Sequence, residues 1–188
     1  MEFESDILNC LETLKKGGLI LYPTDTIWGI GCDATNAKAI EKIYSLKKRS
    51  DEKSMIVLVS GEKEIVKHVA QPDLKVFNYL NTVQKSTTVI YHGAIGLADN
   101  LLAKDGSIAI RICKDEFCKQ LIRRFRKPIV STSANISGEL FPKNFSEINA
   151  EIKTGVDYMV QYRQNDNTPS APSRLIKWEE GKPIILRS

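Results

Sequence analysis

The sequence predicts one α/β unit over residues 1–188, in which helices flank a mixed sheet. Three observations indicate this class. A chain of 188 residues can bury one sizeable core but is short for two full domains. A composition of 42% hydrophobic and 27% charged residues is typical of a folded protein. Helical and strand-like patterns alternate through the first two-thirds, and strand-like patterns dominate the last third.

The first elements follow from caps and hydrophobic spacing. Ser5 or Asp6 can cap a helix whose apolar residues recur at helical spacing, and Gly17-Gly18 can end it. Residues 19–22 then form a short buried strand. Asn36 can cap a second helix, which leads into a basic segment.

The later elements are read in the same way. Pro72 can open a helix, because proline suits a first helical turn. A helix with a basic end is expected over residues 115–125, and residues 163–172 are the best candidate for a mobile loop. The remaining expected elements are a charged helix at 62–69 and strands at 55–59, 87–91, 107–112, 128–131, 157–162, 174–178 and 184–186.

Several classes of protein do not fit this composition. The start of the chain is acidic and has no basic region of a signal peptide, and no stretch approaches the roughly 20 apolar residues of a membrane span. The net charge of +4 gives only weak support for polyanion binding. Neither a disulfide framework nor a structural zinc site is expected, and a reducing cytoplasm fits best, because the cysteines and histidines are scattered: Cys10, Cys32, Cys113, Cys118, His68 and His92.

The first candidate motif is "YPTDTIWGIGCD", residues 22–33. Two threonine hydroxyls directly follow a buried strand, where α/β proteins commonly bind ligands, and Gly29 and Gly31 permit close backbone approach. A turn rich in capping residues is an equally good interpretation of these residues alone. Neither a Walker loop nor a dinucleotide fingerprint occurs in the chain.

Two further candidates are cationic. The segment Lys47-Lys48-Arg49 follows a helix, where the helix dipole favours cations, so a solvated surface is the commoner interpretation. An ATP site without a phosphate loop nevertheless needs such charges, and arginine offers a forked set of donors. Arg111 lies within the apolar strand "IAIRI", where its guanidinium must reach solvent or find an anion. A structural salt bridge is the simpler alternative there.

The third candidate is "STSANISG", residues 131–138, directly after a strand. If strand geometry persists, Ser131, Ser133 and Asn135 share one face and can contact phosphate, carboxylate or sugar groups. The alternative is an ordinary cap-and-turn sequence before a helix. No catalytic triad or covalent nucleophile can be assembled, so chemistry here would depend on positioning and charge neutralisation.

Taken in order, "YPTDTIWGIGCD", "LKKR", "IAIRI", "STSANISG", "APSRLI" and "ILR" resemble the threonylcarbamoyl-AMP synthase family, also called the YrdC-like family. The resemblance runs from about Gly17 to Arg187 and implies a twisted open mixed sheet, a concave basic cleft and the short single-domain form. It implies condensation of L-threonine, bicarbonate or CO2, and ATP into L-threonylcarbamoyladenylate, with release of diphosphate. The product would serve threonylcarbamoyladenosine formation at position 37 of tRNA, which a separate transferase machinery completes.

The resemblance also assigns contact residues to two substrates. It implies Mg2+ with ATP as cofactor and no metal ligand from protein side chains. The implied threonine contacts are Thr26, Arg111, Ser131 and Ser173. The implied ATP contacts are Lys47, Arg49, Lys53, Ser133, Asn135 and Arg187, of which Lys47 and Arg49 would face the phosphates.

Some positions depart from the family pattern. Residues 82–88 replace a Pro-Gly-Pro-x-Thr segment and keep only its final threonine, and Cys113 replaces a proline after the strand arginine. A proline is also absent near Ser54, and Arg174 stands where a small hydroxyl residue is usual.

These departures leave an alternative open, a paralogue that binds tRNA or double-stranded RNA without synthase activity. A carbamoyl-adenylate enzyme, like a domain of hydrogenase maturation proteins, is a third candidate. The absence of Cys-x-x-Cys pairs argues against that third candidate.

Overall fold

The computed structural model describes residues 2–48, 55–168 and 170–188. In these residues a nine-stranded sheet has the order β7-β1-β2-β6-β3-β5-β4-β8-β9. Three neighbouring pairs are parallel, namely β1 with β7, β3 with β5 and β4 with β8, and the others are antiparallel. The predicted mixed sheet is therefore confirmed. The strands are β1 Ile20–Tyr22, β2 Gly29–Gly31, β3 Ile56–Val59, β4 Thr87–Tyr91, β5 Ile108–Ile112, β6 Ile129–Ser133, β7 Tyr158–Met159, β8 Arg174–Glu179 and β9 Lys182–Arg187.

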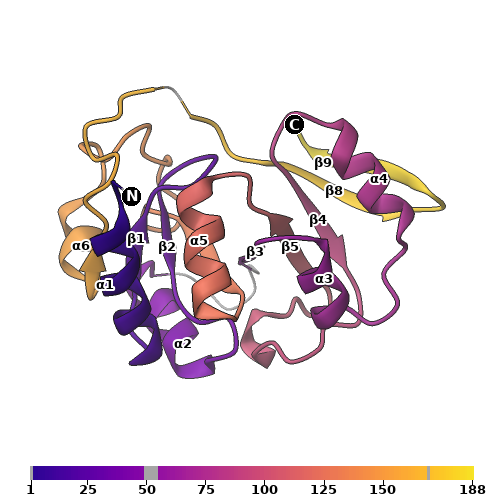
Figure 1. Ribbon diagram of the computed structural model, residues 1–188, viewed down its shortest axis with the longest axis horizontal. Coiled ribbons are helices and arrows are strands. Elements are labelled where there is room, and N and C mark those ends of the chain that lie inside the picture. The colour runs from indigo at the N-terminus through magenta and orange to yellow at the C-terminus, as the bar shows by residue number, and fades with distance from the viewer. Residues whose placement is uncertain (1, 49–54, 169) are drawn as a thin grey trace.

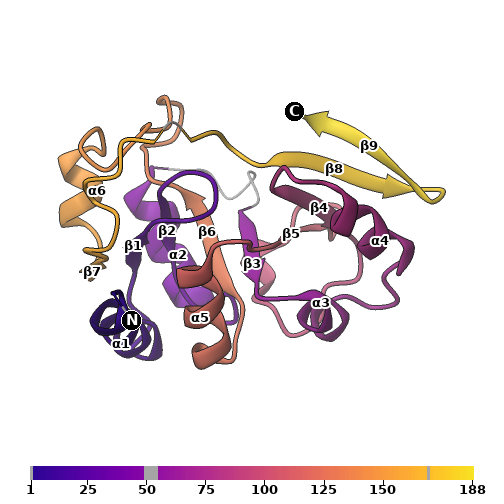
Figure 2. The same cartoon turned by 45° about the horizontal axis from the view of Figure 1, so that its top comes forward.

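Helices flank the sheet along its whole length. Figure 1 shows α1, α2 and α6 near the N-terminus, with α3, α4 and the β8–β9 hairpin at the opposite end. Figure 2 shows α5 between these two groups, and α5 contacts both α1 and β3. The helices are α1 Glu4–Lys15, α2 Ala37–Leu46, α3 Glu62–His68, α4 Lys75–Thr82, α5 Glu116–Phe125 and α6 Ala150–Thr154, with a 3-10 turn η1 at Asp99–Leu101.

The predicted cap of α2 is confirmed, and that of α1 is wrong. The Asn36 side chain accepts a hydrogen bond from the Ala39 backbone N–H at 3.2 Å. Helix α1 already begins at Glu4, so neither Ser5 nor Asp6 is its cap. The buried Asp6 carboxylate instead accepts the Tyr158 hydroxyl at 2.6 Å. The backbone N–H groups of Gln161 and Tyr162 also donate to it, at 3.0 Å and 2.9 Å, so a distant segment rather than the helix's own first turn satisfies this carboxylate.

Other boundaries differ from the sequence pattern for local and long-range reasons. Helix α4 begins at Lys75 rather than at Pro72, because the Asp73 carboxylate accepts the Lys75 backbone N–H at 2.9 Å. The strand expected over residues 157–162 is limited to Tyr158–Met159. Strand β2 was not expected, since Gly-Ile-Gly has little strand character; it forms because β1 and β6 pair with it on both sides.

The core contains all four cysteines, each buried and each with a free thiol. Burial raises the pKa of Cys10, Cys32 and Cys118 above the ordinary range. These thiols therefore act as packed apolar groups rather than as reactive thiolates. None of the helices in the described part of the chain is both long and apolar enough to cross a bilayer.

Candidate functional site

A cavity of about 360 Å³ lies over the centre of the sheet. Alternation along β5 brings Ala109 and Arg111 to its wall, whereas the intervening Ile110 belongs to the core. The end of β6 contributes three consecutive residues, Ser131 to Ser133. The rest of the wall comes from the β1–β2 loop, from β3 and β4, from the loop after β6, and from the start of β8 and the end of β9. The volume lies within the range of small-molecule sites. The predicted concave cleft is therefore present at the centre of the fold.

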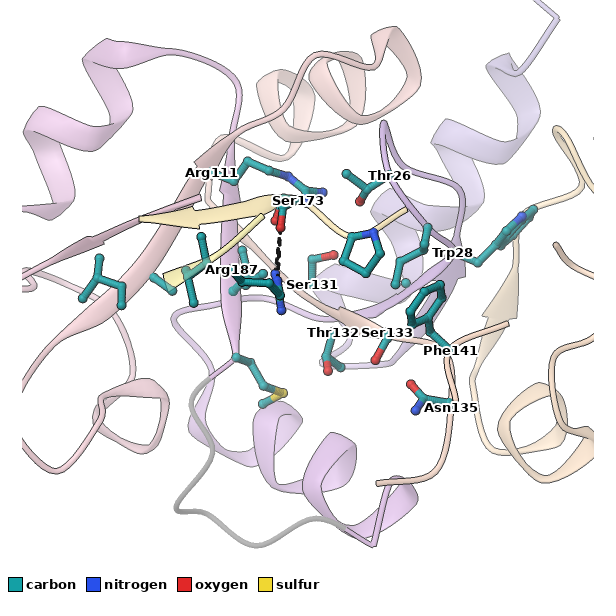
Figure 3. A pocket seen from close by; sticks show the side chains of 18 of the residues that line it. Thr26, Trp28, Arg111, Ser131, Thr132, Ser133, Asn135, Phe141, Ser173 and Arg187 are labelled. Carbon is teal, nitrogen blue, oxygen red and sulfur yellow. Dashed lines mark hydrogen bonds between the residues drawn. The ribbon is translucent and has the colours of Figure 1, made fainter. Parts of the chain in front are cut away.

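Arg111 occupies one end of this cavity. Its side chain is only 3% exposed, and its Nη2 lies 3.2 Å from Oδ1 of Asp25. Figure 3 shows the guanidinium directed toward Thr26. Among the described residues, no hydrogen-bond acceptor meets Nε of Arg111. The structural salt bridge considered from sequence is real, and the same side chain also lines the cavity.

The Asp25 carboxylate is held from several directions. The Ser86 hydroxyl donates to Oδ2, and the Cys113 thiol donates to Oδ1 at 3.2 Å. The Lys114 backbone N–H donates to Oδ2 at 3.4 Å. Burial alone raises the pKa of Asp25, but the Arg111 charge and these hydrogen bonds outweigh it, so the pKa is lowered. Asp25 is therefore an ionised partner of Arg111 at neutral pH.

Thr26 combines a turn role with a place on the cavity wall. Its hydroxyl lies 3.0 Å from the hydroxyl of Thr24, which donates to the Ile27 carbonyl at 2.8 Å. Thr24 is buried and organises the turn, while Thr26 faces the cavity. The predicted cap-rich turn is thus present, and the same loop contributes to the cavity wall.

Arg187 and Ser173 close the cavity on the β8–β9 side. Nε and Nη2 of Arg187 donate to the Ser173 carbonyl at 3.2 Å and 3.0 Å (Figure 3). The Ser173 hydroxyl is paired with that of Thr88 at 2.7 Å. Burial and the positive charge of Arg111 lower the pKa of Arg187. The two guanidinium groups therefore repel each other, and an anion bound between them would relieve this repulsion.

The β6 wall carries the predicted hydroxyl series. Ser131 packs against Gly29, where a Cβ atom would lie 3.0 Å from the serine Oγ, so the predicted close backbone approach is confirmed. Strand β6 ends at Ser133, so Asn135 lines the cavity from a loop rather than by strand alternation. Its amide donates to the Glu139 carbonyl at 2.7 Å. Figure 3 shows Asn135 and Ser133 near Phe141, on the opposite side from Arg111.

Lys47 differs most from its predicted position. It is 1% exposed rather than solvated, and its ammonium donates to the backbone carbonyls of Ser133 and Asn135, the latter at 2.5 Å. It is not among the described residues of the cavity wall. The lysine therefore supports the loop from behind, because the ammonium neutralises carbonyl dipoles that face inward. The predicted contacts Arg49 and Lys53 lie outside the described residues.

Sequence reasoning did not identify several residues that shape this site. Asp25 lies inside a motif that was singled out, so its carboxylate was the available signal. Ser86 and Thr88 reach the site from β4 and the segment before it; both lie in residues 82–88, which depart from the family pattern, but no role was assigned to them. Trp28 and Phe141 add aromatic rings to the wall, and Trp28 packs on Phe145 with ring centroids 4.9 Å apart.

Comparisons with known proteins agree with this geometry. The sequence model of the Sua5, YciO and YrdC family, described as "Telomere recombination", matches residues 12–188. The threonylcarbamoyl-AMP synthase of Pseudoalteromonas translucida is 29% identical over 185 residues, which are 97% of this chain and 98% of that protein. The putative threonylcarbamoyl-AMP synthase of Methanocaldococcus jannaschii is 34% identical over 188 residues, which are 98% of this chain and 87% of that protein.

A solved structure shows the same fold. The crystal structure of P. abyssi Sua5 complexed with L-threonine matches with a TM-score of 0.85 and 19% identity. The match covers 98% of this chain and 54% of the Sua5 chain, so the present chain spans about half of that protein's length. The family match, the two relatives and the shared fold lead to one conclusion. The chain belongs to the Sua5, YciO and YrdC family.

Proposed function

We propose that this chain is a threonylcarbamoyl-AMP synthase. It condenses L-threonine, bicarbonate or CO2, and ATP into L-threonylcarbamoyladenylate and releases diphosphate. The product serves threonylcarbamoyladenosine formation in tRNA, which a separate transferase machinery completes in the cytoplasm. Relatives that carry this name match nearly the whole chain, which supports the proposal.

The observation that carries this function is the convergence of Arg111 and Arg187 on one hydroxyl-lined cavity. Two guanidinium groups that repel each other favour an anionic ligand, and the substrates provide a carboxylate and a triphosphate. Serine and threonine hydroxyls can donate to these oxygens and accept from an amino group or a sugar. The cavity therefore has the chemistry to hold an amino acid beside a nucleotide.

The two substrates occupy opposite ends of the cavity in this proposal. Threonine lies at the end with its carboxylate on Arg111, and its other contacts are Thr26, Ser131 and Ser173. The nucleotide lies toward the Phe141 side. Its contacts in the described chain are Ser133 and Asn135 at that end and Arg187, which lies beside Ser173 and would reach the phosphates between the two substrates; Arg49 and Lys53 are proposed in addition.

The chemistry requires two anions to approach each other. The neutral threonine amine first forms a C–N bond with CO2, as one C=O π bond opens and the nitrogen releases a proton to solvent, which gives a carbamate. One carbamate oxygen then forms a bond to the α-phosphorus, and the bond from that phosphorus to the diphosphate oxygen breaks. Arg187 reduces the repulsion, and Mg2+ on the triphosphate supplies further charge neutralisation. Glu139 is the one carboxylate on the described part of the wall, so the phosphates of ATP and water would supply most oxygen ligands of the ion.

The test is diphosphate release from ATP and Mg2+ in the presence of labelled threonine and bicarbonate. We expect release that requires threonine and bicarbonate, together with a labelled adenylate product. Arg111→Ala should abolish the threonine-dependent release, whereas Arg124→Ala, which removes an exposed partner of Glu4, should leave that release unchanged. The same rate of diphosphate release with and without threonine, or no release at all, would refute the synthase proposal.

RNA binding is the second candidate, favoured by a separate basic cavity of about 280 Å³. Basic side chains at such a surface can neutralise phosphates, which makes binding salt-dependent. Salt-sensitive binding of tRNA or double-stranded RNA, combined with no threonine-dependent diphosphate release, would favour this alternative. The cavity wall contains Glu64, Lys67, His68, Arg123, Arg126, Lys127 and Pro128.

A further inference from the structure

The Arg111–Asp25 pair is buried on both sides, with side chains 3% and 8% exposed. A buried guanidinium without a counterion is strongly disfavoured, so Asp25 determines where the charged end of Arg111 can rest. The backbone of Arg111 is held independently, since it pairs with Leu58 of β3 and Thr88 of β4. Both ends of this long side chain are therefore fixed before any ligand binds.

Asp25 is itself fixed by groups from two other segments. Ser86 precedes β4, and Cys113 and Lys114 follow β5, so three donors besides Arg111 surround one carboxylate. Cys113 and the segment that contains Ser86 are positions where the chain departs from the proline-rich family pattern described above. A proline has no side-chain donor, so these two hydrogen bonds to Asp25 depend on the sequence of this chain.

We infer that Asp25 is a positioning residue of the synthase, which holds the Arg111 guanidinium in place for the threonine carboxylate. This inference rests on the proposed function. An arginine side chain has many rotamers, and a fixed guanidinium loses less entropy when it binds a carboxylate. Asp25 does not touch the threonine carboxylate and affects its binding only through Arg111. The hydrogen bonds from Ser86 and Cys113 keep the Asp25 side chain in its orientation.

The sign of the effect separates positioning from simple charge competition. If Asp25 only neutralised Arg111, its replacement by asparagine would release positive charge and tighten threonine binding. If Asp25 positions Arg111, the same replacement loosens the guanidinium and weakens threonine binding while ATP binding stays unchanged. The two possibilities therefore predict opposite shifts in one dissociation constant.

The experiment compares Asp25→Asn with Asp33→Asn in the full chain. Asp33 is a matched control, because it is also buried and paired with a cation, Lys127, at 2.6 Å, away from the cavity. We expect Asp25→Asn to raise the threonine Kd by calorimetry, and the threonine KM, about tenfold, with the ATP KM changed less than about twofold. Asp33→Asn should leave the threonine Kd and both KM values unchanged.

Two further sets of variants guard against misfolding and against an indirect effect. Ser86→Ala and Cys113→Ala keep the ion pair and should each raise the threonine Kd about two- to threefold. If Asp25→Asn does not fold, these two variants decide the question. In an Arg111→Ala background, Asp25→Asn should add nothing to the threonine Kd, because its effect passes through Arg111.

The outcomes distinguish this inference from the proposed function. Threonine binding without diphosphate release would refute the synthase activity, and calorimetry would still test Asp25. Normal turnover with an unchanged or lower threonine Kd in Asp25→Asn would overturn the positioning role alone. Failure of the wild-type chain to bind threonine would overturn both.

Discussion

The ammonium of Lys47 lies 2.5 Å from the backbone carbonyl oxygen of Asn135. It also donates to the Ser133 carbonyl, and the whole residue is buried. Ser133 and Asn135 are the two residues proposed to contact the nucleotide from this loop. A buried cation therefore determines the shape of the nucleotide-side wall from behind.

Replacement of Lys47 by methionine tests this support. The variant keeps an apolar chain of similar length but removes the ammonium donor from the Asn135 carbonyl and leaves the Ser133 carbonyl with the Asn135 backbone N–H, so we expect a loss of about 1–3 kcal/mol in the free energy of unfolding. Urea denaturation measures it. Lys48→Met is the control, because Lys48 is 62% exposed and pairs with Glu151 at the surface, where such pairs contribute about 0–1 kcal/mol. Equal losses in both variants would contradict a structural role for Lys47.

Arg187 provides a second prediction, about charge and geometry. Arg187→Ala removes a cation from the nucleotide side and the two hydrogen bonds to the Ser173 carbonyl, so we expect the Kd for a non-hydrolysable ATP analogue to rise about tenfold or more. Arg187→Lys keeps the charge but not the forked donors, so its Kd for the analogue should lie between those of the wild type and of Arg187→Ala. If the lysine and alanine variants bind the analogue like the wild type, Arg187 does not contact the nucleotide.

Gly31 tests how closely β2 approaches its neighbours. A Cβ atom there would lie 2.6 Å from both the Tyr22 ring and the Val130 carbonyl oxygen. Gly31→Ala should therefore destabilise the fold by about 1–3 kcal/mol or more, since both neighbours belong to packed strands. Gly61→Ala should be tolerated, because nothing lies within 4 Å of its Cβ position and its backbone is extended. Comparable melting temperatures for the two variants would contradict the close approach.

The pH dependence of stability follows from Asp25. Its pKa in the folded chain is lowered from the ordinary value of 3.8, so its ion pair stabilises the fold above that pH and is lost as the pH falls through the folded-state pKa. We expect Asp25→Asn to lower the free energy of unfolding at pH 7 and to reduce its decrease on acidification below about pH 4. Denaturation curves at a series of pH values measure both effects. Parallel wild-type and variant curves would show that Asp25 does not contribute to acid sensitivity.

Local patterns in the sequence determined most elements, and the family resemblance marked many residues of the cavity wall. The Asn36 cap, the bounds of β4 and the mixed sheet follow from spacing and capping chemistry that act within a few residues. Seven of the predicted contacts, from five separate segments, line the same cavity: Thr26, Arg111, Ser131, Ser133, Asn135, Ser173 and Arg187. Their residue types already indicated anion binding, because hydroxyls and guanidinium groups are the donors that such ligands need.

The tertiary structure alone decided how these side chains are held. Strand β2 exists because two neighbours pair with it, Lys47 turned inward to carbonyls of a loop far along the chain, and Asp25 found Arg111. Periodicity and capping report contacts between residues a few positions apart, whereas these partners are brought together only by strand order and register. The sequence thus shows which groups can bind an anion, and the folded sheet decides which of them are free to do so.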